Sequence, residues 1–283
     1  MSARAALAAA SLLVACAAPA PAPQSAGVPE IPVEVLKPGG AGPFPAVVML
    51  HDCSGLGVRS SGAPRRWARE LVEQGYVVAI PDSFSTRGFP AGVCVDPSPN
   101  RVNVSPLRRV KDAYDTLDYV RALPFVDGRH VAVMGGSHGG STTLATIVMS
   151  SRDSPGLASR KRDGFAAVIA LYPGCDVGNP RWSTQYKAAA PLLILSGELD
   201  DWTPAAPCVS LVEAATREGS SARIKVYPGV HHSFDSAGPV RYNAERVNAN
   251  APGGRGATTA GNAEAWADSR EQVSAFLKQH LRR

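Results

Sequence analysis

Short apolar runs alternate with amphipathic stretches along most of the chain. Continuous runs rich in Val, Ile, Leu and Ala are typical of strands buried on both faces of a parallel sheet, and apolar residues at three-to-four spacing are typical of helices. The pattern predicts strands at Ile31–Leu36, Ala46–His51, Tyr76–Pro81, His130–Gly135, Ala166–Leu171, Pro191–Ser196 and Arg223–Tyr227. It predicts helices at Pro64–Gln74, Pro106–Leu123, His138–Ser151, Pro204–Glu218 and Glu264–Leu281.

This alternation predicts an α/β fold with a mostly parallel, doubly wound sheet flanked by helices. The second helix carries a stripe that we expect in the core, made of Leu107, Val110, Tyr114, Leu117 and Val120. No repeat and no linker divides the chain after the N-terminal region, so residues 30–283 are expected to form one domain. The stretch Asn243–Gly261, rich in Gly, Asn and Ala, is predicted to be a long surface loop.

Composition narrows the class of protein. The chain has 283 residues, of which 45% are hydrophobic and 19% charged, a globular profile that excludes disordered, collagen-like and polytopic membrane proteins. The net charge is +5. The basic residues occur as scattered doublets such as Arg65-Arg66 and Arg108-Arg109, which we interpret as solvated surface, so no nucleic-acid binding is expected.

The N-terminus has the features of an export signal. Arg4 precedes an apolar stretch, Ala5–Ala15, that is too short to span a bilayer. Its end, Leu13-Val14-Ala15-Cys16, resembles a bacterial lipobox, which is cut before a cysteine that becomes lipidated. We therefore predict a signal peptide over residues 1–15, a lipid on Cys16, a tether over residues 16–29, and a protein held at the periplasmic side or cell envelope by that lipid alone. The alternative is an ordinary exported protein cut within Ala17–Ala26.

Four cysteines remain after such processing: Cys53, Cys94, Cys175 and Cys208. In an oxidising compartment an even number predicts two disulfides, with three pairings open. No two of the four lie close together in the sequence, and the six histidines, among them His51 and His138, form no His-Glu-x-x-His pattern. We expect neither a metal nor a cofactor.

The stretch Gly135-Gly136-Ser137-His138-Gly139 fits the pattern Gly-x-Ser-x-Gly. It directly follows a predicted strand and opens a predicted helix. That context is typical of a nucleophile elbow, in which a strained turn lifts a serine hydroxyl out at the carboxyl edge of the sheet. Ser137 is therefore the candidate nucleophile.

A serine hydroxyl needs a base, which is oriented in turn by a carboxylate. Asp200 follows the predicted strand Pro191–Ser196, and His232 follows the next predicted strand, so both loops open on the edge that carries Ser137. Their neighbours Asp201 and His231 are rivals, and we prefer Asp200 and His232.

Ester chemistry also needs donors for a developing oxyanion, commonly the backbone N–H after the nucleophile and one from the loop after an earlier strand. His138 supplies the first candidate N–H. Cys53, in the loop after the strand Ala46–His51, supplies the second.

Together these residues resemble the dienelactone hydrolase family of the α/β-hydrolase superfamily, in a variant with a serine nucleophile. The matching stretches are Val48 to Leu56, Pro81-Asp82-Ser83-Phe84, Val131 to Gly140, Gly197-Glu198-Leu199-Asp200 and Tyr227 to Phe234. The resemblance covers about residues 30 to 283 and implies the α/β-hydrolase fold.

Typical members use a cysteine nucleophile held by a glutamate near the oxyanion loop, whereas this chain has Ser137 and, near the place of the glutamate, the shorter Asp52. The resemblance also implies substrate-binding roles for Asp52 and for Arg87, which lies about where the family binds a substrate carboxylate. The family strand order implies disulfides between Cys53 and Cys94 and between Cys175 and Cys208, because each pair follows neighbouring strands.

We therefore predict a monomeric serine hydrolase that cleaves small carboxylic esters through an acyl-enzyme. A lactone or small-polyester hydrolase is the alternative among enzymes. From another class, the alternative is a non-catalytic lipoprotein of the envelope that keeps the fold as a binding module. The complete Ser, Asp and His set in the required order favours the enzyme.

Overall fold

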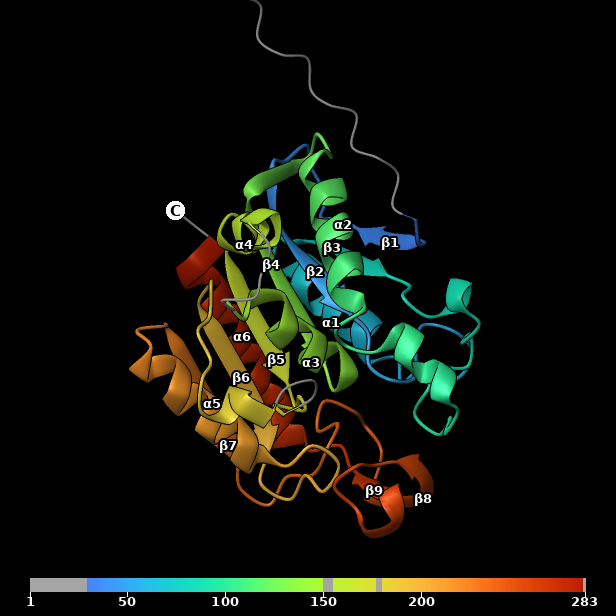
Figure 1. The fold of residues 1–283 in the computed structure, drawn as a ribbon. Helices are drawn as coiled ribbons and strands as arrows, with labels where there is room; N and C mark the ends of the chain where they lie inside the picture. The colour runs from blue at the N-terminus through green and yellow to red at the C-terminus, as the bar shows by residue number, and fades with distance from the viewer. Residues whose placement is uncertain (1–29, 150–154, 177–179, 282–283) are drawn as a thin grey trace, which may run out of the picture.

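A computed structural model describes residues 30–149, 155–176 and 180–281 (Figure 1). The predicted signal peptide, Cys16 and the tether lie outside the described residues. Within the described part of the chain, no helix combines the length and the apolar character needed to cross a membrane.

The main sheet has seven strands in the spatial order β1-β3-β2-β4-β5-β6-β7. Its strands are β1 (Val33–Leu36), β2 (Phe44–Leu50), β3 (Val77–Pro81), β4 (Val126–Gly136), β5 (Ala167–Leu171), β6 (Leu192–Gly197) and β7 (Ala222–Tyr227). Strand β1 pairs antiparallel with β3, and every other pair is parallel. All seven predicted strands are confirmed, and the sheet is mostly parallel as expected.

The apolar runs form strands because both faces of the sheet are covered. In β2, Val48 and Leu50 belong to one core cluster, and Val47 and Met49 belong to the other. Helices α2 (Arg109–Arg121), α3 (His138–Ile147) and α5 (Ala205–Arg217) pack on the first face, and α1 (Ala63–Glu73) and α6 (Ala263–Leu281) pack on the second (Figure 1). This is the doubly wound arrangement that the sequence predicted.

The carboxyl ends of the parallel strands meet at one edge, which the hairpin of β8 (Arg241–Val247) and β9 (Arg255–Thr259) approaches from below in Figure 1. The prediction of a long surface loop over Asn243–Gly261 is therefore wrong in one respect, because the stretch contains the end of β8 and the whole of β9. The end of the hairpin also contacts the loop that carries His232, because the N–H of Ala260, just after β9, donates to the carbonyl of His232 at 3.1 Å. The remaining elements of the described residues are helix α4 (Pro155–Arg162) and the 3-10 helices η1 (Ser85–Arg87), η2 (Pro99–Val104), η3 (Pro180–Ser183) and η4 (Pro252–Gly254).

Two expectations for the second helix are corrected. Helix α2 begins at Arg109, so Leu107 precedes it and is 51% exposed instead of lying in the core. Arg109, expected on the solvated surface with Arg108, is fully buried. Tyr114, Leu117 and Val120 lie in the core as predicted.

Candidate active site

Ser137 sits in a strained turn between β4 and α3. Its φ of 52° and ψ of −118° lie outside the regions that non-glycine residues usually adopt. The turn is held because the N–H of Ser137 donates to the carbonyl of Leu171 at 2.9 Å. Gly139 is required two residues later, because a Cβ there would lie 2.1 Å from the carbonyl oxygen of Leu50. The predicted elbow geometry is present.

Three side chains from three loops form one hydrogen-bonded chain at the carboxyl edge. Oγ of Ser137 lies 2.9 Å from Nε2 of His232, and Nδ1 of His232 lies 2.7 Å from Oδ2 of Asp200. All three residues are buried. Because a carboxylate oxygen accepts, Nδ1 carries the imidazole proton, which leaves Nε2 to accept from the Ser137 hydroxyl.

Asp200 is oriented by the start of the loop that follows it. Its Oδ1 accepts from the backbone N–H groups of Trp202 and Thr203 at 3.0 and 2.8 Å. The Thr203 hydroxyl lies 3.0 Å from Oδ2 and 2.9 Å from the carbonyl of Tyr172. These contacts were not predicted, because the sequence placed the loop but gave no sign of which of its residues would turn back on the carboxylate.

The rivals have other partners. Asp201 accepts from the backbone N–H and the hydroxyl of Thr258 at 2.8 and 2.7 Å, which ties the β8–β9 hairpin to this loop. Nδ1 of His231 lies 3.1 Å from the carbonyl oxygen of Leu199. The structure therefore brings Asp200 and His232, and neither rival, to Ser137.

The loop after β2 is fixed at several points. A disulfide joins Cys53 to Cys94, and the N–H of Val93 donates to the carbonyl of Cys53 at 2.7 Å. Asp52 accepts from the N–H of Ser54 at 2.7 Å and from the hydroxyl of Ser61. The second disulfide joins Cys175 to Cys208, so both pairings implied by the family resemblance are present.

His138 and Cys53, the predicted oxyanion donors, both line a cavity that reaches Ser137. His138 begins α3, where backbone N–H groups have no partner within the helix and favour negative charge. Its side chain points elsewhere, since Nδ1 lies 2.8 Å from Nη1 of Arg109. Burial, followed by the charge of Arg109, lowers the pKa of His138 well below its ordinary value.

His51 is likewise a structural histidine. Its Nε2 accepts from the N–H of Ser83 at 3.2 Å, and its Nδ1 lies 2.8 Å from the carbonyl of Asp52. Burial lowers its pKa well below the ordinary value. Among the described residues, no group of three or more His, Cys, Asp or Glu side chains could hold a metal ion.

Arg87 has a different environment from the one expected. Its guanidinium makes two hydrogen bonds of 2.6 Å to the carboxylate of Asp112, which is 3% exposed, and one of 2.8 Å to the carbonyl of Ser83. The bond to Asp112 raises the pKa of Arg87. Both chelating nitrogens are thus engaged within the fold, and Arg87 lines neither cavity that reaches Ser137, so the structure does not bring it to the site where the resemblance implied it.

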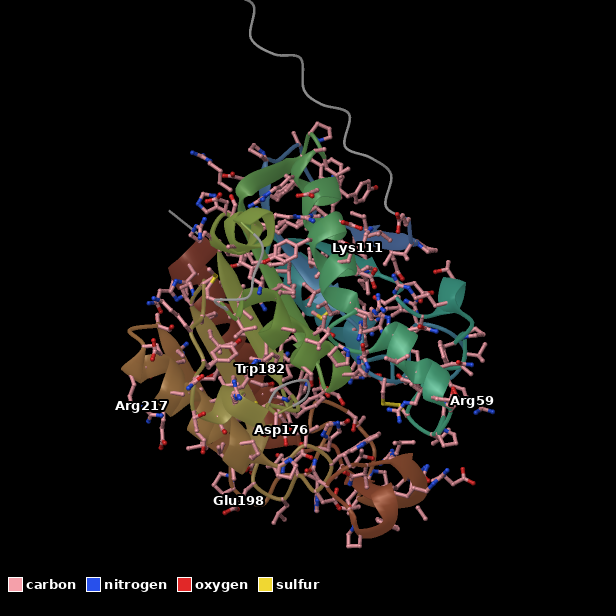
Figure 2. The ribbon with its side chains drawn as sticks, viewed as in Figure 1. Arg59, Lys111, Asp176, Trp182, Glu198 and Arg217 are labelled. Carbon is pink, nitrogen blue, oxygen red and sulfur yellow. A yellow bond between two sulfur atoms is a disulfide. The ribbon has the colours of Figure 1, made fainter. Side chains whose placement is uncertain are left out.

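Two cavities of about 470 and 460 Å³ meet at Ser137. The loop residues Ser98, Arg101 and Asn250 line the first. In Figure 2, Asp176, which lines the first cavity, and Arg59, which lines the second, lie well apart along the lower part of the molecule. A buried serine, histidine and carboxylate beside two cavities have the groups that acyl transfer requires.

Solved structures of other proteins share the fold. The chain is 18% identical to a Klebsiella pneumoniae protein assigned as a dienelactone hydrolase, with a TM-score of 0.62 over 88% of this chain and 93% of that one. It is 20% identical to esterase 2 of Thermogutta terrifontis phosphorylated by paraoxon, with a TM-score of 0.59 over 87% and 88% of the two chains. These likenesses show a shared fold.

A curated relative is dipeptidyl-peptidase 5 of Porphyromonas gingivalis, which is 23% identical over 201 residues. The match covers 59% of this chain and 27% of the peptidase, so the chain spans about a quarter of that relative. Residues 31–281 match the sequence model of the Dienelactone hydrolase family. With its hydrolase fold and its Ser137 elbow, the chain belongs to the dienelactone hydrolase family.

Proposed function

We propose that this member of the family is a serine hydrolase that cleaves carboxylic esters of small molecules through an acyl-enzyme on Ser137. The observation that carries the proposal is the continuous hydrogen-bonded chain from Ser137 through His232 to Asp200, at 2.9 and 2.7 Å. Family membership supports a hydrolase. A thermophilic esterase of the same fold is known with paraoxon-derived phosphorylation, the type of adduct that nucleophilic hydrolases form.

In the first half of the reaction, Oγ of Ser137 bonds to the ester carbon as its proton passes to Nε2 of His232. We assign stabilisation of the oxyanion to the backbone N–H groups of Cys53 and His138. His232 then gives its proton to the leaving alkoxide oxygen as the carbon–oxygen bond breaks. Water then attacks the acyl-enzyme by the same steps: His232 takes a proton from the water and returns it to Oγ of Ser137 as the carboxylic acid leaves. Asp200 orients the imidazole and stabilises its charged form throughout.

The test is hydrolysis of p-nitrophenyl acetate, butyrate and octanoate by the purified mature domain and by Ser137→Ala, with a fluorophosphonate probe and intact mass on both. We expect turnover and a single covalent adduct in the wild type, and neither in the variant. A folded wild-type protein without turnover or adduct would contradict the proposal and favour the binding module.

We further propose that the protein is exported and held at the cell envelope through Cys16. The two disulfides support an oxidising compartment. Labelling of the full chain with a palmitate analogue tests the anchor, and Cys16→Ser should abolish labelling. Labelling that persists in the variant, or its absence from the wild type, would contradict the anchor without touching the catalytic proposal.

A further inference from the structure

Ser137 lies at the junction of two cavities whose linings differ. We call them the Val102 cavity and the Arg246 cavity, after residues that line only one of them. Four residues line both: Cys53, Cys94, Ser137 and Trp202. A substrate bound to Ser137 can therefore extend in two directions.

Trp202 is the largest of the side chains that line both cavities. Its Nε1 donates to the carbonyl of Val247 at 2.9 Å, and the guanidinium of Arg246 lies 4.9 Å from its ring centre. Arg246 and Val247 are consecutive in β8. Arg246 lines its own cavity and Val247 lines the Val102 cavity, so these two neighbours face different cavities.

The two linings have different chemistry. The Val102 cavity has an apolar set made of Pro97, Val102, Pro106, Val247 and Ala249, with one arginine, Arg101, and one carboxylate, Asp176. The Arg246 cavity is lined chiefly by hydrogen-bonding side chains, including Asp52, Arg59, Ser61, Asn243, Glu245 and Arg246. Its two arginines and two carboxylates balance in charge, so the lining favours neither an anion nor a cation.

The reaction geometry decides which part of an ester occupies which cavity. His138, whose N–H is a predicted oxyanion donor, lines only the Val102 cavity, and His232 lines only the Arg246 cavity. The alcohol oxygen must lie beside His232, because that imidazole protonates it as it leaves. The tetrahedral carbon also carries Oγ of Ser137 and the oxyanion, so its remaining substituent, the acyl chain, points into the other cavity.

We infer that the site is built for esters that join an apolar acyl chain, held in the Val102 cavity, to an uncharged, hydroxylated alcohol, held in the Arg246 cavity. The inference rests on the proposed function, since it names the substrate class of the same site. It has a kinetic consequence. The alcohol has departed before deacylation, whereas the acyl chain is present in both half-reactions.

Two variants with matched controls test the assignment. Val102→Trp fills the Val102 cavity from its exposed rim, and Val58→Trp makes the same change at an exposed position that lines neither cavity. Arg246→Leu removes a polar wall of the other cavity, and Arg241→Leu is its control on the exposed start of the same strand. Thermal melts of all four establish that each variant is folded.

Stopped-flow release of p-nitrophenol separates acylation from deacylation, and steady-state rates with glyceryl monobutyrate and ethyl butyrate report on the alcohol. We expect Val102→Trp to slow both half-reactions with the octanoate ester about tenfold relative to the acetate ester. We expect Arg246→Leu to lower kcat/KM for the glyceryl ester about tenfold relative to the ethyl ester and to leave deacylation of the butyryl-enzyme unchanged. The controls should match the wild type.

The assignment is overturned if Arg246→Leu alters deacylation, if Val102→Trp selectively impairs the glyceryl ester, or if either variant behaves like its control. Those results leave the acyl-enzyme intact and refute only the substrate class. Failure of the proposed function looks different, because the wild type itself would then show no burst and no Ser137 adduct.

Discussion

Arg109 donates from Nη1 to Nδ1 of His138 across 2.8 Å, which places a fully buried guanidinium directly behind the residue that follows the nucleophile. The ring of Phe84 lies 5.0 Å from the same guanidinium. Among the described residues, Nε and Nη2 of Arg109 find no hydrogen-bond acceptor. Burial lowers the pKa of Arg109 to about 10, as expected for a cation with few partners.

Arg109→Met should therefore separate stability from activity. An unbranched apolar side chain removes the cost of burying a partly satisfied charge, so the free energy of unfolding should be unchanged or higher. Without its donor, the His138 ring is less firmly held and its backbone N–H is less well aimed, so kcat should fall about tenfold. Urea unfolding and ester hydrolysis measure the two effects, with Arg108→Met at the exposed neighbour as control. An unchanged kcat, or a marked loss of stability, would contradict this account.

Asp200 and Asp201 are adjacent carboxylates with different partners, which makes them a matched pair. Asp200→Asn removes the carboxylate that fixes the proton on Nδ1 of His232, so we expect kcat to fall by about 10⁴ through the wrong tautomer. Asp201→Asn keeps an acceptor for Thr258 and should change kcat by less than about threefold. Rates of hydrolysis and of fluorophosphonate labelling measure both. Equal losses in the two variants would show that the loop, and not the Asp200 carboxylate, is what activity requires.

Arg87→Ala should lower the stability of the protein without changing its preference between charged and neutral ester substrates. The substitution leaves the carboxylate of Asp112, which is almost fully buried, without its two hydrogen bonds to Arg87. The free energy of unfolding should therefore drop by roughly 2–3 kcal/mol. Because the guanidinium is occupied within the fold, KM for the p-nitrophenyl monoester of succinate and for the neutral butyrate ester should change equally. A selective rise for the succinate ester would restore Arg87 to the substrate site.

Particular residues show which features of the fold and the site could be predicted from the sequence. Strands β2 to β6 were predictable because each contains a short apolar run between two covered faces. Ser137, Asp200 and His232 follow from their places after strand ends. The β8–β9 hairpin was missed because residues such as Arg241, Glu245 and Arg246 break the apolar alternation. Tertiary contacts hold it instead, among them the bond of 2.9 Å from Nδ2 of Asn248 to the carbonyl of Asp201.

The environments of Arg87 and Arg109 could not be predicted from the sequence for a related reason. Arg87 and its partner Asp112 are 25 residues apart, and the sequence contains no local pattern that links them. Arg109 stands next to Arg108 in a doublet, yet only the first turn of α2 decides which of the two faces the core. A pattern of charged residues predicts, on average, which residues lie at the surface. Whether one particular cation is buried depends on tertiary packing, which the sequence does not reveal.

The two disulfides should contribute similarly to stability and differently to catalysis. They link residues 41 and 33 positions apart, and the chain-entropy estimate gives about 4 kcal/mol for each loop. Cys53 and Cys94 line both cavities, and the Cys53 N–H is a predicted oxyanion donor, whereas Cys208 lies in α5 within the core. The double variant Cys53→Ser/Cys94→Ser should therefore lose both stability and kcat, and Cys175→Ser/Cys208→Ser should lose stability with most of its kcat retained. Urea midpoints and burst kinetics on both variants check this. If the second variant loses as much kcat as the first, the effect arises from general loosening of the fold and not from the position of the oxyanion loop.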